Sequence, residues 1–523
     1  MHADLSRLTF RPDRHYSAVI AQQGRVQLDA DANEQAAIQL HQARTLAADL
    51  IGAHGGPRGS AGFRVEYVGG RHDIDTLYIH GGRYYVDGIL LDANRPAPGT
   101  PVPSADEDTQ DAQAQEPDTA QPPAYWTYWD QPDGFRDPEK PADRLPSPAQ
   151  SPFLVYLKVW ERSVTAAEDP ALREVALGAA LPDTAARVKV VWQVLPLSLA
   201  ALEIDEPEPS KEVVSAAFDR WALKQSTPAA RLAARSERPD HADEDPCLVK
   251  PDARYRGPEN QLYRVEIHDA GEAKDATFKW SRENGSVVFP VDELDGTWVQ
   301  LASLGYDDKL DLDVGDRVEF TDTAYASRLE PLPLLRVEEL DLPGRRVRLS
   351  AEPEPGVGRL PHLNPFLRRW DHHEGPRRKG RTTALRNGAV PVTEGEWLPL
   401  EDGVEVYFAK GAAYTTGDHW LIPARTATGS VEWPVDQARR PLLQAPGGIL
   451  RSFAPLALVK GEGSTVDLRR AFGWAASSVP AADEAALATE AQARREEQSA
   501  DTDPSHGRSQ TTAEAEAAVD GDK

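Results

Sequence analysis

The 523-residue sequence is poor in sulfur, because it contains one cysteine, Cys247, and one methionine. A single thiol cannot form an internal disulfide or supply a cysteine-rich zinc site. The sequence also has no run of about eighteen apolar residues, the length that a membrane-spanning helix needs. Its first residues lack the apolar segment of a secretion signal. We therefore expect a protein that is made in the cytoplasm and has no membrane anchor.

Acidic residues outnumber basic ones, and the formal net charge is −26. The acidic excess is concentrated in residues 96–150, with eleven acidic and three basic side chains, and in 478–523, with eleven and four. An acidic chain repels both the phosphate backbone of nucleic acids and the surface of anionic membranes. Neither is expected as a partner. The 43 prolines and 38 glycines favour strands and turns over long helices.

Recognisable catalytic motifs are also missing. The sequence has no G-x-S-x-G, no P-loop and no HExxH. The Asp-rich stretch 307–316 lacks the glycine and glutamate of an EF-hand, and residues 368–374, with two adjacent histidines, are predicted to be a surface loop. We expect no catalytic residue, no cofactor and no metal. Carboxylates that could serve glycoside hydrolysis, but that fit helix caps and ion pairs better, are Glu161, Glu168, Asp169, Glu174 and Asp183.

One long helix is predicted directly after Leu28. Asp31 and Glu34 have the spacing of a capping box, and Gly52 stands where a helix commonly ends. Between them, apolar residues recur at alternating steps of four and three, which predicts a single narrow stripe on one helix face. A stripe rich in alanine suits close approach to a second helix. Its members are Ala36, Leu40, Ala43, Ala47 and Leu50.

The rest of the chain is expected to be mainly β. A hairpin is predicted from 77–80 and 83–86 around Gly81-Gly82, and short strands with regular turns dominate from residue 260 onward, which is typical of sandwiches and barrels. The fold class is therefore an N-terminal helix and hairpin, followed by two or more β-sandwich or barrel-like units. The predicted divisions are 1–95, 96–150, 151–250 (mixed α and β), 251–350, 351–477 and 478–523.

Two of these divisions are predicted to be disordered. Residues 96–150 are rich in Pro, Asp and Gln, and the tail 478–523 is acidic and has no aromatic residue. An aromatic cluster at 125–129 interrupts the first of them and is expected to dock onto the folded body. Its indoles, Trp126 and Trp129, are also the best candidates for exposed ligand-binding aromatics, whereas Trp160, Trp192 and Trp280 are expected in cores.

Several blocks of this sequence resemble a bacterial family of unknown function that is encoded in clusters for contractile, phage-tail-like injection systems. The opening block, HYSAVIAQQGRVQLDADANEQ at 15–35, is also similar to the attachment segments of some phage tail-fibre and baseplate proteins. One departure is Ala32, where relatives commonly place Trp. The other blocks include 159–162 (VWER), 259–267 (ENQLYRVEI), 278–286 (FKWSRENGS) and 420–429 (WLIPARTATG).

The resemblance implies a non-enzymatic structural or attachment component of a contractile particle, associated with its baseplate or tail fibre. Its partners would be other subunits of that particle and further copies of itself, with a trimer favoured, and it could leave the cell with the particle. The alternative is a carbohydrate-binding or carbohydrate-active β-sandwich protein, with a glycan as ligand. The residues expected to dock are His15, Tyr16, Gln23, Gly24, Arg25, Asp29, Asp31, Asn33, Glu34 and Leu40.

Overall fold

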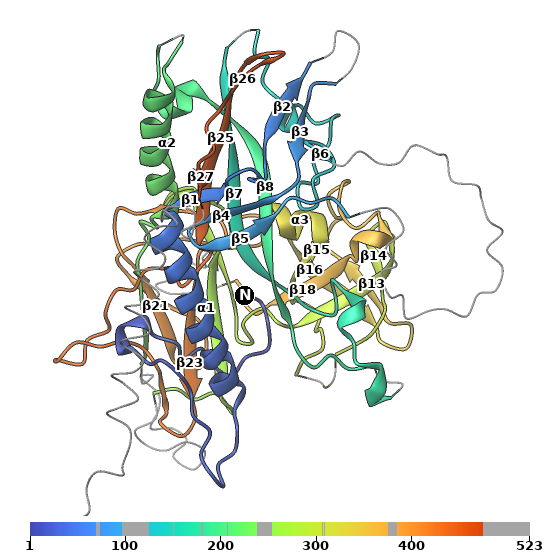
Figure 1. Ribbon diagram of the computed structural model, residues 1–523. Helices are drawn as coiled ribbons and strands as arrows, with labels where there is room; N and C mark the ends of the chain where they lie inside the picture. Colours follow the sequence, from blue (N-terminus) through green and yellow to red (C-terminus); the bar gives the residue numbers. More distant parts are fainter. Residues whose placement is uncertain are drawn as a thin grey trace, which may run out of the picture. The chain divides into compact units, whose positions relative to one another are not determined.

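The computed structural model in Figure 1 describes residues 1–69, 74–96, 125–149, 151–178, 181–206, 208–237, 254–305, 307, 309–374 and 384–473. It consists mostly of β-strands, together with a long N-terminal helix, so the predicted fold class is confirmed. Residues 1–471 form one compact unit, and the second unit, 472–523, contains the predicted tail. Cys247 and the tail 478–523 lie outside the described residues.

Six strands close into a small barrel. Its interior is filled by alternate side chains such as Val299, Val318 and Leu367, none of which is exposed to solvent, as the period of two in a strand requires. The last strand extends to Trp370 and residues 368–372 are buried, so the prediction of a surface loop at 368–374 is wrong for most of its length. In barrel order the strands are β13 (Val288–Asp295), β14 (Trp298–Leu301), β17 (Arg346–Leu349), β16 (Leu334–Asp341), β15 (Arg317–Thr321) and β18 (Phe366–Trp370).

A five-stranded and a three-stranded sheet share a second core, which contains Trp280, Phe408 and Trp420. The first sheet comprises β19 (Val390–Pro391), β12 (Thr277–Ser281), β10 (Gln261–Ile267), β23 (His419–Arg425) and β24 (Ser430–Val431). The second comprises β20 (Trp397–Pro399), β21 (Val404–Phe408) and β9 (Leu232–Ser236), and β11 (Gly271–Glu272) pairs with β22 (Ala413–Tyr414). The two sheets thus combine strands from the predicted divisions 151–250, 251–350 and 351–477.

The longest strands form an antiparallel sheet that carries cores on both faces. Trp192 on one face lies in the same core as Phe63 and Tyr84 of the N-terminal sheets, whereas Tyr156 on the other contacts Phe218 of the second long helix. In order, the sheet contains β26 (Ser464–Asp467), β25 (Arg451–Gly461), β7 (Phe153–Val164) and β8 (Arg187–Ser198), and the covering helix is α2 (Lys211–Ser226).

The N-terminal strands form two small sheets rather than the predicted hairpin. The pairing of 77–80 with 83–86 is wrong, because the chain leaves one sheet at Gly81-Gly82 and enters the other. The tight turn lies instead at Asp87-Gly88, where φ is +47° and +77°, as a two-residue hairpin turn requires. One sheet contains β2 (Val65–Val68), β3 (Thr76–His80) and β6 (Tyr125–Thr127), and the other β1 (His54–Pro57), β4 (Arg83–Val86) and β5 (Ile89–Asp92).

The aromatic cluster at 125–129 docks onto the body, as predicted. Tyr128 is 2% exposed and lies in the core beneath the N-terminal sheets. Residues 125–149 are packed, so the prediction of disorder is wrong for this part of 96–150, whereas 97–124 and 150 lie outside the described residues. The remaining short elements are α3 (Thr323–Arg328), β27 (Ala471–Phe472) and the 3-10 helices η1 (Pro12–Arg14), η2 (Pro141–Asp143), η3 (Pro170–Leu172), η4 (Val175–Leu177), η5 (Leu199–Leu202) and η6 (Pro361–Leu363).

Candidate functional site

The predicted helix is present as α1 (Asp29–Ile51), and residues 1–28 before it are named the arm. The helix begins after Leu28, whose N–H donates to Asp31 at 3.3 Å. It ends where Gly52 donates to the Ala48 carbonyl at 2.8 Å. The helix start and end are therefore as predicted, but the capping box of Asp31 with Glu34 is wrong, because Glu34 is engaged by the arm instead. In Figure 1 the dark-blue arm forms a loop that extends past the lower end of α1.

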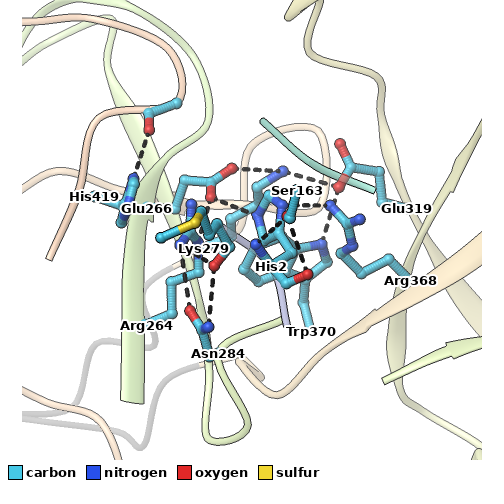
Figure 2. A network of polar contacts seen from close by, with 12 residues as sticks. His2, Ser163, Arg264, Glu266, Lys279, Asn284, Glu319, Arg368, Trp370 and His419 are labelled. Atoms are coloured by element: carbon cyan, nitrogen blue, oxygen red, sulfur yellow. Dashed lines mark hydrogen bonds and ion pairs between the residues drawn. The ribbon is translucent and has the colours of Figure 1, made fainter. Parts of the chain in front are cut away.

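The first residues of the arm are anchored in the body through His2, shown in Figure 2. The His2 N–H donates to Ser163 Oγ on β7 at 2.7 Å, and that hydroxyl donates to the His2 carbonyl at 3.1 Å. The ring nitrogens contact Glu266 Oε2 at 2.9 Å and Arg368 Nη1 at 3.0 Å. Residues from three strands thus hold a single residue of the arm, one through its backbone and two through its ring.

These contacts fix the charge state of the His2 ring. Arg368 can only donate, so Nδ1 must accept, and Nε2 must therefore carry the proton that it donates to Glu266. Burial lowers the pKa of His2 well below its usual value, and the neighbouring guanidinium groups of Arg264 and Arg368 lower it further. The imidazole in this structure is neutral.

His2 belongs to a larger buried network of charges. Glu266 accepts from Arg264 Nε at 2.6 Å, and Lys279 lies 3.5 Å from Glu266 and 3.0 Å from Glu319. Trp370 closes the network by donating its indole N–H to Glu319 at 3.1 Å. Arg264 and Trp370 are almost completely buried. Because buried charges are costly without partners, each of these groups depends on the others.

Asn284 holds the backbone of the anchored residues. Its amide donates to the carbonyls of Met1 at 3.0 Å and Ala3 at 2.8 Å. Asn284 is fully buried and has φ of +54°, a left-handed conformation that asparagine tolerates better than most residues. It lies in the block 278–286, so that block positions the start of the arm.

Beyond the anchor, side chains of α1 hold the arm along the helix. Asp29 accepts from the Ser6 N–H at 3.0 Å and from its hydroxyl at 2.6 Å. Glu34 accepts from the Thr9 hydroxyl at 2.5 Å. Gln35 accepts from the Val19 N–H at 2.7 Å, after the arm has turned back at η1. The acidic and amide residues that open α1 therefore bind the arm of the same chain.

Between these attachments the arm exposes apolar side chains. Ile20 is 82% exposed and Val26 is 84% exposed. Large apolar residues normally lie inside, and neighbouring exposed ones mark interaction sites. α1 also exposes apolar side chains, at Leu40, Leu46 and Leu50. We name the resulting set, Tyr16, Ile20, Val26, Leu28, Leu40, Leu46 and Leu50, the apolar arm surface.

The apolar stripe predicted for α1 therefore faces solvent rather than the body. Within α1 only Ala30 and Ile38 are buried. The helix is attached to the body by a two-fold contact of Arg44 with Glu161 on β7, at 2.6 and 2.8 Å. The β4–β5 turn also abuts it closely, because a Cβ on Gly88 would lie 2.1 Å from the Arg44 carbonyl oxygen.

The structure divides the ten residues expected to dock into two groups. Three carboxylates, Asp29, Asp31 and Glu34, are engaged within the chain as described above. The others lie on the surface, where Gly24 forms a turn with φ of +70°. These exposed residues are His15, Tyr16, Gln23, Gly24, Arg25, Asn33 and Leu40.

Four of the five carboxylates considered for glycoside hydrolysis serve structural contacts, and the fifth, Asp183, lies in an isolated β-bridge with Arg173. Glu168 pairs with buried Arg162, and Glu161 pairs with Arg44. Asp169 and Glu174 cap the 3-10 helices that follow them. Across the described ranges, no three His, Cys, Asp or Glu side chains are grouped so that they could hold a metal.

The two candidate ligand-binding indoles are half-buried and pack against the core of the N-terminal sheets. The Arg95 guanidinium lies 4.6 Å above the Trp126 ring. Trp129 donates its indole N–H to the Asp75 carbonyl at 3.1 Å. Both indole rings therefore contact residues of their own chain. Glycan binding by these rings stays a prediction. Trp160, Trp192 and Trp280 are buried, as expected.

A comparison with protein families matches residues 1–130, 146–220 and 208–464 to a family of unknown function (DUF6519). The chain belongs to this family. The match covers the arm, α1 and every strand of the anchor, so the anchored arm lies within the family's shared region. No curated protein and no solved structure matches the chain. Among the described helices of this family member, none has the length and apolar character needed to cross a membrane.

Sequence reasoning missed the anchor of the arm. Neither His2 nor Ser163 stands in a motif that predicts contact between them, and 161 residues separate them. The only available signal was the block 278–286, which contains Lys279 and Asn284. The block 278–286 contains many polar side chains, so its sequence fitted an exposed strand. Only the tertiary structure shows that the block is buried.

Proposed function

We propose that this protein is a non-enzymatic attachment component, which docks onto a partner protein through its arm and α1. The observation that carries the proposal is the apolar arm surface, because these side chains are exposed on a segment that the chain itself holds in place. Side-chain hydrogen bonds from α1 fix the arm at Ser6, Thr9 and Val19. A prefixed segment loses less conformational entropy on binding than a free one.

The chemistry of this surface favours a protein partner. It offers aliphatic and aromatic contact area, with Ile20 and Val26 more than four-fifths exposed. Apolar contacts of this kind form the centre of protein interfaces, while polar residues form the rim. Arg25 and the exposed amides Gln23 and Asn33 would supply that rim.

For the partner we propose other subunits of a contractile, phage-tail-like particle, at its baseplate or tail fibre. Support comes from the resemblance of the block at 15–35 to attachment segments of such particles. Most of the exposed part of that block lies on the apolar arm surface or beside it. Contractile tails have threefold and sixfold axes, so we also propose that this chain assembles with copies of itself, as a trimer.

The test is a double variant, Ile20→Asp with Val26→Asp, in the cell that produces the particle. We expect the variant to fold, because neither side chain is buried, and its amount in purified particles to fall at least about tenfold, since each charge must be desolvated at the interface. Quantitative mass spectrometry of purified particles measures this ratio.

The matched control is Val175→Asp with Leu177→Asp, on η4, where the side chains are 65% and 59% exposed. This control should remain in the particle at the wild-type ratio. A folded Ile20→Asp, Val26→Asp variant at the normal ratio would show that the arm does not dock. Absence of the wild-type chain from the particles would reject the particle as its partner.

A further inference from the structure

A cluster of histidines surrounds the anchor of the arm. His268, His372 and His419 are 2%, 0% and 5% exposed, and the side chain of His2 is 22% exposed. His2 belongs to the arm, and His419 begins β23 and pairs with Glu266 of β10, whereas His268 and His372 follow the ends of β10 and β18. Buried histidines are neutral or paired with an acid, so the contacts of each ring decide which applies here.

None of the three deeply buried rings contacts a carboxylate within hydrogen-bond distance in the described part of the chain. His419 Nδ1 lies 3.1 Å from the Gly417 carbonyl, and His372 Nε2 lies 2.7 Å from the Gly388 carbonyl. His268 Nδ1 is buried without a hydrogen-bond partner in that part of the chain. Burial lowers the pKa of His268 to about 4 and that of His372 to about 3. For His419, burial and the Arg264 guanidinium lower it well below its usual value.

We propose that this junction is an acid-sensitive latch, in which protonation of histidines that the junction holds neutral detaches the start of the arm while the barrel remains folded. The proposal concerns the arm of the isolated protein and does not depend on what the arm binds.

The charges around His2 explain why protonation would release it. A second proton on the His2 ring would be on Nδ1, which faces Arg368 Nη1. The nearby acid, Glu266, is already paired with Arg264 and Lys279. The groups that face the ring and its network from each neighbouring strand are Arg264 and Glu266 on β10, Lys279 on β12, Glu319 on β15, Arg368 on β18 and His419 on β23, and the arm itself adds the buried α-amino group of Met1. Cations outnumber acids among them even before any histidine is protonated.

The sign of the pH effect follows from the lowered pKa. A histidine freed into water regains a pKa of about 6.5 and takes up a proton that the anchored form resists. Release of His2 is then favoured about 30-fold at pH 5 relative to neutral pH, and about 1,000-fold if His419 becomes hydrated with it. The histidine contribution to the anchored state is complete above about pH 6.5 and weakens as the pH falls. The Met1 α-amino group, whose pKa burial lowers to about 4, adds a loss in the same direction that begins below about pH 8.

The arm should detach before the body opens, because different bonds hold the two. Beyond the anchor the arm is held by side-chain hydrogen bonds at Ser6, Thr9 and Val19 and by an exposed ion pair of Arg7 with Glu432. The barrel is closed by backbone pairing around all six strands, which opens only cooperatively.

Hydrogen exchange of the full chain, followed by mass spectrometry at pH 7.5 and pH 5.0, tests the latch. Labelling times are scaled for the intrinsic pH dependence of exchange. We expect peptides from residues 1–12 to lose protection at least tenfold at pH 5.0, and peptides from β14 and β17 to keep theirs. His2→Gln should reduce the ratio of protection at pH 7.5 to protection at pH 5.0 for residues 1–12. The glutamine amide can donate to Glu266 and accept from Arg368 without titrating.

Two further variants make the result decisive. His419→Gln, with His2 intact, should also reduce the ratio, whereas His362→Gln, at an exposed position on η6, should leave it unchanged. Equal protection of residues 1–12 at both pH values would overturn the proposal. So would parallel loss of protection in the barrel, or a full pH response in folded His2→Gln. The amount of the chain in purified particles, which measures docking, is determined in a separate experiment. Failure of the acid response can therefore be distinguished from failure of docking.

Discussion

The two ends of the arm reverse the usual placement of side chains. At its start, His2 is inserted among buried charges from four strands. Towards its end, Ile20 and Val26 are exposed to solvent. In most proteins charges lie outside and large aliphatic groups inside. The buried end holds the arm to its own chain by specific polar contacts, and the exposed end leaves apolar area available to another protein.

The comparison indicates how the two tasks of an attachment segment are separated. Polar contacts are directional and fix the position of the backbone, whereas apolar contacts depend on area and suit a partner surface. Changes at the start of the arm should therefore alter stability and order. Changes at its far end should alter binding alone.

The largest effect is expected at the buried end, from Arg264→Met. Arg264 is 1% exposed, and its loss leaves Glu266 with fewer cations in a buried site. Removal of one partner of a buried ion pair costs about 3–5 kcal/mol. Denaturant unfolding should show this loss. The exposed pair of Arg11 with Asp13 provides the control, because Arg11→Ala should hardly change stability. A loss no larger than that of the control would mean that the network does not support the fold.

A smaller effect is expected from Asn284→Gly. Glycine keeps the left-handed backbone but removes the amide that donates to Met1 and Ala3. With the bond that Asn284 Oδ1 accepts from Arg264 Nη1 at 3.3 Å, three hydrogen bonds are lost, which should cost about 2–4 kcal/mol, and hydrogen exchange of residues 1–6 should rise. Asn387→Gly is the matched control, since Asn387 is exposed and also has positive φ, at +50°. Unchanged protection of residues 1–6 would show that Asn284 does not hold them.

The smallest effect on stability is expected midway along the arm, from Thr9→Val. This change preserves the shape of the side chain and removes the hydroxyl that donates to Glu34. A single hydrogen bond of this kind contributes about 0.5–1.5 kcal/mol. Thermal unfolding should detect a loss within this range, while exchange near residues 7–12 increases. A loss above that of Asn284→Gly would place the main attachment of the arm at Thr9 rather than at its start.

The sequence was informative wherever a pattern is local. The presence of α1 and its end at Gly52 follow from the sequence pattern, and the periodic Trp residues of the strands are buried as their alternation predicts. The turn at Asp87-Gly88 carries the stronger local signal for a hairpin than Gly81-Gly82, since both of its residues adopt positive φ. The choice of Gly81-Gly82 failed because glycine also permits a chain to pass from one sheet to another.

Contacts between distant residues were not predictable. β10 pairs with β23, and β7 with β25, across about 150 and 300 residues, and neither pairing leaves a trace in spacing or composition. The same holds for His2 with Glu266, which are 264 residues apart. Residues 368–374 were predicted to be a surface loop, but Arg368 and Arg369 are buried in β18. Arg368 contacts His2, and Arg369 pairs with Asp371 and donates to two backbone carbonyls.

By itself, the sequence determined the class of the fold, the helix and the character of the segment at 15–35, because periodicity, caps and exposed apolar residues are properties of neighbours along the chain. The tertiary structure decided which face of α1 meets the body, where the arm is anchored and which charges are buried together. Those outcomes depend on side chains that meet only when strands from several parts of the chain assemble, and their energies arise from burial that no local pattern encodes.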